Sequence, residues 1–189
     1  MREVEAKAHV RDRDALLRNL AELGCILGDP VRQEDVVYVR AFGSMEEFLG
    51  NDFFLRIRKT PDATLFTLKY HPNRSENGNA SAMPIEHELK VDSRPELEAM
   101  LELLGFKAAL HITKERRMGH YGDREVCLDD VDDLGSFIEV ERLIGHDEEV
   151  EPVRQELISF LESLGVPAED VGAKRYDIQH LERRFGKTG

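Results

Sequence analysis

The chain opens with charged side chains at alternate positions, Glu3, Glu5 and Lys7, separated by the small apolar residues Val4 and Ala6. Alternate residues of a β-strand point to the same side, so an extended segment here would carry two carboxylates and an amine on one face. Carboxylate oxygens bind hard divalent cations, and an ammonium group binds anions. Taken alone, this stretch agrees with a metal-and-anion site and equally with a solvated edge strand.

The same alternation recurs in five later segments. Their charged or polar positions are Arg56 and Arg58, Thr67 and Lys69, Glu86, Glu88 and Lys90, Lys114 and Arg116, and Glu139 and Glu141. A sheet with one solvated face also alternates, and that reading stays open. These positions are nearly all Arg, Lys and Glu, however, which favours a shared ionic site. Cations bind phosphate oxygens and carboxylates bind metal ions, so the set suits a polyphosphate with its metal.

The elements that must position these residues form two similar halves. Strands are predicted near residues 3–10, 35–41, 53–59, 63–70, 85–91, 113–118, 124–129 and 137–143. Helices are predicted from Asp12 to Gly24, from Ser93 to Gly105, over about 152–164 and near 176–181. Each half begins with a strand bearing Glu-x-Lys and a helix ending in Leu-Gly, which indicates a weak internal repeat and an α+β fold.

The amphipathic helices need an apolar surface to cover. If they cover the apolar faces of the strands from outside, the ionic faces would line a closed or nearly closed barrel. Charges in such an interior are costly unless they are paired or bind a ligand. An interior with charges of both signs would therefore suit a polyphosphate carrying its metal.

Composition limits the partners. The 189 residues predict one domain over 1–185 and a frayed tail over 186–189. A net charge of −12 argues against binding to nucleic acids or anionic membranes. No apolar run is long enough to span a membrane, no secretory signal is visible, and Cys25 and Cys127 are predicted to be free thiols. These features predict a cytoplasmic protein with a small-molecule partner.

Glu3-x-Glu5-x-Lys7 resembles the ExExK signature of the CYTH superfamily, which joins class IV adenylyl cyclases and thiamine triphosphatases. The resemblance runs in order over residues 2 to 181 and is closest to the class IV cyclase branch. Its further motifs are Gln33-x-Asp35-x-x-Tyr38, Leu55-Arg56-Ile57-Arg58, Thr67-Leu68-Lys69, Glu86-x-Glu88, Leu104-Gly105-Phe106, Lys114-x-Arg116, Leu128-Asp129-x-Val131 and Leu134-Gly135-x-Phe137-Ile138-Glu139-x-Glu141.

The resemblance implies an eight-stranded antiparallel β-tunnel of two α/β halves, with helices packed outside. It implies phosphate binding by Lys7, Arg56, Arg58, Lys69, Lys114 and Arg116, and binding of Mg²⁺ or Mn²⁺ by Glu3, Glu5, Asp129, Glu139 and Glu141. It implies the main catalytic roles for Glu5, Glu139, Arg58 and Lys114. Glu86, Glu88, Lys90 and Lys174 fall within or near matching segments without an assigned role.

Two reactions agree with these residues. A cyclase would convert ATP to cyclic AMP and pyrophosphate, whereas a triphosphatase would hydrolyse thiamine triphosphate or tripolyphosphate. The closest branch favours the cyclase. Class IV cyclases often carry a His-Phe pair before ExExK, and only Met1 and Arg2 precede the motif here, which favours the hydrolase. A non-catalytic polyphosphate-binding module is a third alternative, and a homodimer is an open alternative to a monomer.

Overall fold

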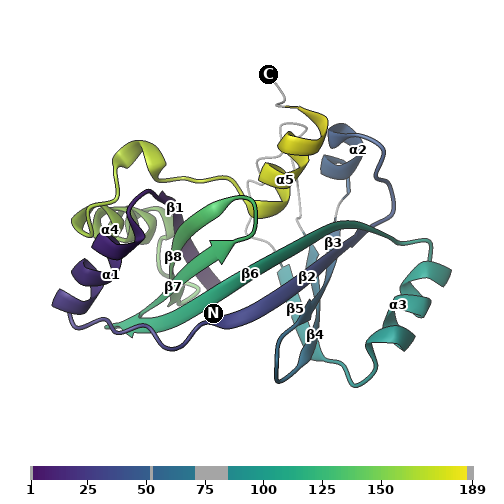
Figure 1. Cartoon of the computed structure of the whole chain (residues 1–189), viewed down its shortest axis with the longest axis horizontal. Coiled ribbons are helices and arrows are strands. Elements are labelled where there is room, and N and C mark those ends of the chain that lie inside the picture. The colour runs from purple at the N-terminus through teal and green to yellow at the C-terminus, as the bar shows by residue number, and fades with distance from the viewer. Residues whose placement is uncertain (1, 52, 71–84, 187–189) are drawn as a thin grey trace. The chain divides into compact units, whose positions relative to one another are not determined.

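The computed structural model describes residues 2–51, 53–70 and 85–186. Its strands form one sheet in the order β1-β8-β7-β6-β2-β3-β4-β5 (Figure 1). The strands are β1 (Arg2–Val10), β2 (Val31–Val39), β3 (Phe53–Lys59), β4 (Thr64–Tyr70), β5 (Ile85–Lys90), β6 (Lys107–Tyr121), β7 (Arg124–Val131) and β8 (Gly135–Ile144). The helices are α1 (Arg13–Glu22), α2 (Met45–Leu49), α3 (Arg94–Leu103), α4 (Val150–Ser163), the 3₁₀ turn η1 (Ala168–Asp170) and α5 (Tyr176–Phe185).

The eight antiparallel strands and the α+β class are confirmed. The hydrogen-bonded order has two ends, β1 and β5, so the sheet is not closed over the described residues, and its strand number and antiparallel pairing are those predicted for the tunnel. Helix α2 was not predicted, because it is only five residues long and therefore too short to show helical periodicity. The polar loop predicted at 73–82 lies outside the described residues.

The chain divides into two compact units. Unit 1 comprises residues 1–31 and 114–174, and unit 2 comprises residues 32–113 and 175–189. Strand β6 contributes to both units, because the boundary falls within it. The units do not coincide with the two repeated halves of the sequence, since each unit takes strands from both halves.

In unit 1 the predicted alternation separates an apolar face from an ionic one. Val4, Ala6 and Ala8 of β1 are buried in a core with Val126, Leu128, Ile138 and Val140 of the neighbouring strands. Helices α1 and α4 cover this core with Leu16, Leu20, Val153, Leu157 and Phe160, and Leu164 at the end of α4 joins them. Helix α1 begins after Asp12, whose carboxylate oxygen accepts a hydrogen bond from the Ala15 amide at 2.9 Å and caps the helix.

In unit 2 helices cover both faces of the strands. Leu101 of α3 packs against Val36, Tyr38, Leu55, Ile57 and Phe106. Helices α2 and α5 pack on Val37, Val39 and Phe54, which continue the strand faces of Asp35 and Arg56. In this unit the ionic residues therefore occupy only part of their strand face, and apolar residues of the same face pack against α2 and α5.

The apolar stripe predicted for α3 is only partly buried. Leu101 is buried, but Met100 is 54% exposed and Leu104 is 65% exposed. Leu104 is the C-cap residue, where the helix has already ended. In the described part of the chain, no helix is long and apolar enough to cross a membrane. Cys25 and Cys127 are both free and buried, as predicted.

Leu157 is expected to be a main contributor to the stability of unit 1, since its side chain is fully buried between α4 and the sheet. We expect Leu157→Ala to lower the free energy of unfolding by about 2–5 kcal/mol, through lost apolar burial and the cavity left behind. Urea denaturation measures this change. The control Leu103→Ala alters a side chain that is 89% exposed and should change stability by less than about 0.5 kcal/mol. Equal effects of the two substitutions would contradict this packing.

Candidate functional site

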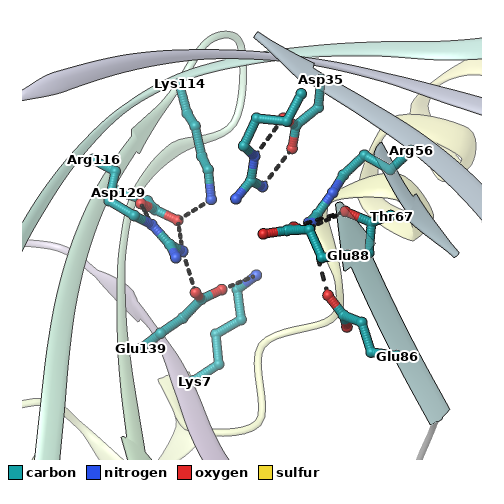
Figure 2. Close-up of polar contacts among 11 residues, drawn as sticks. Lys7, Asp35, Arg56, Thr67, Glu86, Glu88, Lys114, Arg116, Asp129 and Glu139 are labelled. Atoms are coloured by element: carbon teal, nitrogen blue, oxygen red, sulfur yellow. Dashed lines mark hydrogen bonds and ion pairs between the residues drawn. The ribbon is translucent and has the colours of Figure 1, made fainter. Parts of the chain in front are cut away.

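Unit 1 holds a buried ion-pair cluster centred on Asp129 (Figure 2). Lys114 Nζ lies 2.7 Å from Asp129 Oδ2. Arg116 binds the same carboxylate through two nitrogens, with Nε donating to Oδ1 and Nη2 donating to Oδ2, both at 2.6 Å. Antiparallel pairing of β6 with β7 places Arg116 directly opposite Asp129. The predicted cation pair Lys114 and Arg116 is thus held by one fully buried acid.

Glu139 extends this cluster to β1. Arg116 also donates to Glu139, and Lys7 Nζ lies 3.0 Å from Glu139 Oε1. Pairing of β1 with β8 places Lys7 opposite Glu139, although 132 positions separate them in the chain. The cluster contains three cations, Lys7, Lys114 and Arg116, against two carboxylates, so these five groups carry one excess positive charge.

The charge states in this cluster follow from burial and ion pairing. Burial alone would raise the pKa of Asp129 and of Glu139, but the neighbouring cations outweigh it and hold both pKa values below their ordinary range. Burial lowers the pKa of Lys7, and Glu139 offsets part of that effect. Because Asp129 and Glu139 remain ionised, their ion pairs hold Lys7, Lys114 and Arg116 in place. The excess positive charge of the cluster favours the binding of an anion.

A second group of unit 1 contains three acids, Glu3, Glu5 and Glu141. One carboxylate oxygen from each lies within 4.8 Å of the others. Glu5 stands opposite Glu141 in the pairing of β1 with β8. Burial, and then the charges of Glu3 and Glu139, raise the pKa of Glu141 to about 8. A divalent cation would relieve this repulsion, and carboxylate oxygens are its preferred ligands, so the donor set fits Mg²⁺ or Mn²⁺.

The five predicted metal ligands therefore fall into two groups. Glu3, Glu5 and Glu141 lie together with their carboxylates close to one another. Asp129 and Glu139 instead contact Lys7, Lys114 and Arg116. Metal ligation stays a prediction for all five, and the first group has the arrangement that an ion would need.

Unit 2 carries its own ionic cluster on β2, β3, β4 and β5 (Figure 2). Arg58 binds Asp35 through two hydrogen bonds of 2.7 Å, Nε to Oδ1 and Nη2 to Oδ2. Arg56 Nη2 donates to Thr67 Oγ1 at 3.0 Å, and that hydroxyl donates to Glu88 at 2.8 Å. Burial lowers the pKa of Arg56, and the positive charge of Arg58 lowers it further.

The acids of β5 contact the remaining predicted cations of unit 2. Lys69 Nζ lies 3.2 Å from Glu86 Oε2, and Arg56 Nη2 lies 3.6 Å from Glu86 Oε1. The side chains of Lys69 and Glu86 are each 39% exposed, so this ion pair is weaker than the buried pairs of unit 1. Glu86 and Glu88, which had no assigned role, thus contact Arg56 and Lys69.

Sequence reasoning missed three residues on these faces. Asp35 lies in the motif Gln33-x-Asp35-x-x-Tyr38, but its role as the partner of Arg58 depends on the pairing of β2 with β3. Thr67 is fully covered and connects Arg56 to Glu88. Cys127 lies between Glu125 and Asp129 on alternating positions of β7, opposite Glu139. Burial raises the pKa of the Cys127 thiol, which keeps it neutral among these charges.

Comparisons with known proteins agree with this arrangement. The chain matches the CYTH domain over residues 1–176. It is 29% identical over 176 residues to a protein of Methanocaldococcus jannaschii named "Putative adenylate cyclase", covering 93% of this chain and 97% of the relative. The solved structure of protein PH1819 of Pyrococcus horikoshii has a TM-score of 0.75 at 25% identity, covering 96% of this chain and 99% of that one.

A further solved structure shows the same fold at lower identity. It is a protein of Hippeastrum described as having a dominant triphosphatase activity, with a TM-score of 0.63 and 18% identity. The match covers 97% of this chain and 95% of that chain.

Proposed function

This chain belongs to the CYTH family, and from that premise we propose that it is a metal-dependent enzyme acting on a small-molecule triphosphate. One observation carries the proposal. In unit 1, buried carboxylates hold Lys7, Lys114 and Arg116 in place, and Lys7 shares strand β1 with Glu3 and Glu5 of the group of three acids. Positioned cations beside potential metal ligands are what phosphoryl chemistry requires, because charge develops on phosphate oxygens in the transition state.

Each unit carries its own set of residues that we propose to bind phosphate. Unit 1 supplies Lys7, Lys114 and Arg116, and unit 2 supplies Arg56, Arg58 and Lys69. Each arginine already makes side-chain hydrogen bonds that restrict its orientation. Such preorganisation stabilises developing charge without a reorganisation cost during the reaction. The two-nitrogen contacts of Arg116 and Arg58 also fix the planes of their guanidinium groups, and a planar fork of this kind suits phosphate recognition.

Glu3, Glu5 and Glu141 are the residues that we propose to hold the metal. A bound Mg²⁺ or Mn²⁺ would supply charge neutralisation at phosphate oxygens. Asp129 and Glu139 would have to give up contacts with Lys114, Arg116 or Lys7 to bind it directly. We therefore assign these two acids to orienting the cations.

Adenylate cyclase is the leading reaction, and triphosphate hydrolysis is the second. In the first, the ribose 3′-hydroxyl of ATP attacks the α-phosphorus and pyrophosphate leaves; in the second, water attacks the terminal phosphorus and orthophosphate leaves. The name of the Methanocaldococcus jannaschii relative favours the first, and the activity described for the Hippeastrum protein favours the second. The same cations would serve both reactions.

Product analysis distinguishes the two reactions. The protein is incubated with ATP, thiamine triphosphate or tripolyphosphate, each with Mg²⁺ and with Mn²⁺, and the products are identified chemically. Cyclic AMP with pyrophosphate establishes a cyclase, and orthophosphate establishes a triphosphatase. If the protein bound these triphosphates tightly in the presence of metal but turned over none of them, it would be a binding module and not an enzyme.

Metal affinity is expected to rise with pH. With its pKa raised to about 8, Glu141 is largely protonated at pH 7 in the metal-free protein. A carboxylate must lose its proton to bind a metal ion, so the affinity should increase from pH 6 to pH 8 and level off above that value. Calorimetric titration with Mn²⁺ in buffers of different ionisation enthalpy measures both the affinity and the proton released. Glu141→Gln removes the titrating group, and an unchanged pH dependence in that variant would contradict this assignment.

A further inference from the structure

A surface hollow of about 520 Å³ lies in unit 1, apart from the residues assigned to the triphosphate. Its lining includes Leu23 at the end of α1, Tyr121 and Arg124 of the β6–β7 hairpin, and Gln155, Ser159 and Phe160 of α4. Figure 1 shows α1 and α4 beside each other in this unit. Small-molecule sites have volumes of about 300–1,000 Å³, so the hollow is large enough for a compact organic ligand.

One wall of the hollow is aromatic. The rings of Tyr121 and Phe160 stack at a centroid distance of 5.1 Å with an interplanar angle of 13°. Leu23 adds an aliphatic side chain that is 42% exposed. Stacked rings held by a helix and a hairpin offer a rigid apolar surface, which favours a flat ring in the ligand.

Arg124 supplies a cation at the same place. Its guanidinium carbon lies 5.1 Å from the centroid of the Phe160 ring. Over the described residues it has no ion-pair partner, and its buried Nε has no hydrogen-bond partner. A buried donor without a partner is costly, so this guanidinium group is poorly compensated within the described part of the chain.

The acids near Arg124 belong to another arginine. Arg142 stands directly opposite Arg124 in the pairing of β7 with β8. Arg142 contacts Asp123 at 2.7 Å, Glu148 at 3.0 Å and Glu156 at 3.2 Å. Arg124 thus stays an uncompensated cation in a chain whose net charge is −12. This combination favours an anion at the hollow.

We propose that the hollow binds a small flat organic anion, whose ring packs on Tyr121 beside the largely buried Phe160 ring and whose carboxylate or phosphate pairs with Arg124. The hydroxyl of Ser159 and the amide of Gln155 offer further polar contacts at the rim. This site is separate from the proposed triphosphate chemistry, and either one can hold if the other fails.

Two matched probes test the site and the kind of anion. Phenylacetate and phenyl phosphate carry the same ring with different acids, benzyl alcohol carries the ring without charge, and inorganic phosphate carries the charge without the ring. Backbone amide shifts of the isotope-labelled full chain are followed during titration. We expect shifts at 121–124 and 155–163 with a dissociation constant on the order of 1 mM for at least one aromatic anion. Whichever of phenylacetate and phenyl phosphate binds more tightly shows whether the site prefers a carboxylate or a phosphate. Benzyl alcohol and inorganic phosphate should each bind about tenfold more weakly than that probe.

Variants test whether Arg124 and the hollow are responsible for binding the aromatic anions. Arg124→Gln should weaken the tighter probe by about tenfold or more, since a charge-assisted contact is lost. Ser159→Phe keeps the charge but fills the hollow, and it should also prevent binding. Arg154→Gln, on the exposed part of α4, is the matched control and should bind as the wild type does. Wild-type affinity in Arg124→Gln, no shifts around the hollow, or shifts only around Lys7 and Arg116 would each overturn the proposal.

Discussion

Glu5→Gln is expected to reduce metal-dependent turnover of the triphosphate by about 10²–10³-fold, the loss typical when one charge-stabilising group of an active site is removed. Glu5 shares a strand face with Glu3 and stands opposite Glu141, so it belongs to the group of acids that we propose to hold the metal. The amide keeps the size of the side chain but removes its negative charge. The main loss should therefore be in metal affinity, with little change in stability.

The measurement separates metal binding from folding. Turnover is measured across a range of Mn²⁺ concentrations for the wild type and for Glu5→Gln, with thermal unfolding recorded for both. We expect the variant to need a much higher Mn²⁺ concentration and to recover only part of the activity. Glu115→Gln alters an exposed acid on the other face of β6 and serves as the control. Wild-type turnover in Glu5→Gln at limiting Mn²⁺ would remove Glu5 from the metal site.

Strand alternation explains why so much of the site could be predicted. Because side chains of a strand alternate, the positions of Glu3, Glu5 and Lys7 already determine that they share a face once the segment is extended. The apolar residues between them determine which face is covered by helices. Local patterns therefore predicted the strands, the caps of α1 and the ionic faces.

Pairing between distant strands explains what could not be predicted. Whether Glu139 meets Lys7 or a metal ion depends on the register of β1 with β8, to which local patterns contribute little. The separation of the five predicted metal ligands into two groups follows from that register. Cys127 is neutral, so nothing in a charge pattern marked it as part of the ionic face. The two compact units also combine strands from both sequence halves, and only non-local pairing determines that.

Arg116 connects the two buried acids of unit 1, and its replacement should affect both stability and turnover. Arg116→Ala leaves Asp129 with Lys114 and Glu139 with Lys7, and it removes the cation that joins them. Each acid keeps one cation, so the expected cost is that of lost hydrogen bonds to charged groups, about 1.5–3 kcal/mol, and not that of an unpaired buried charge. Denaturant unfolding should show a loss of this size.

Arg116→Lys separates the role in phosphate binding from the role in folding. Lysine keeps the positive charge between Asp129 and Glu139, but its single ammonium cannot reproduce the two-nitrogen contact with Asp129 and donate in a fixed direction to a phosphate. We expect this variant to remain folded while its turnover falls by about 10²-fold or more. Arg117→Ala, at the adjacent position on the opposite face of β6, controls for general effects on the strand. If Arg116→Lys turned over the triphosphate as fast as the wild type, the guanidinium geometry would have no part in the reaction, and the positive charge alone would account for the role of Arg116.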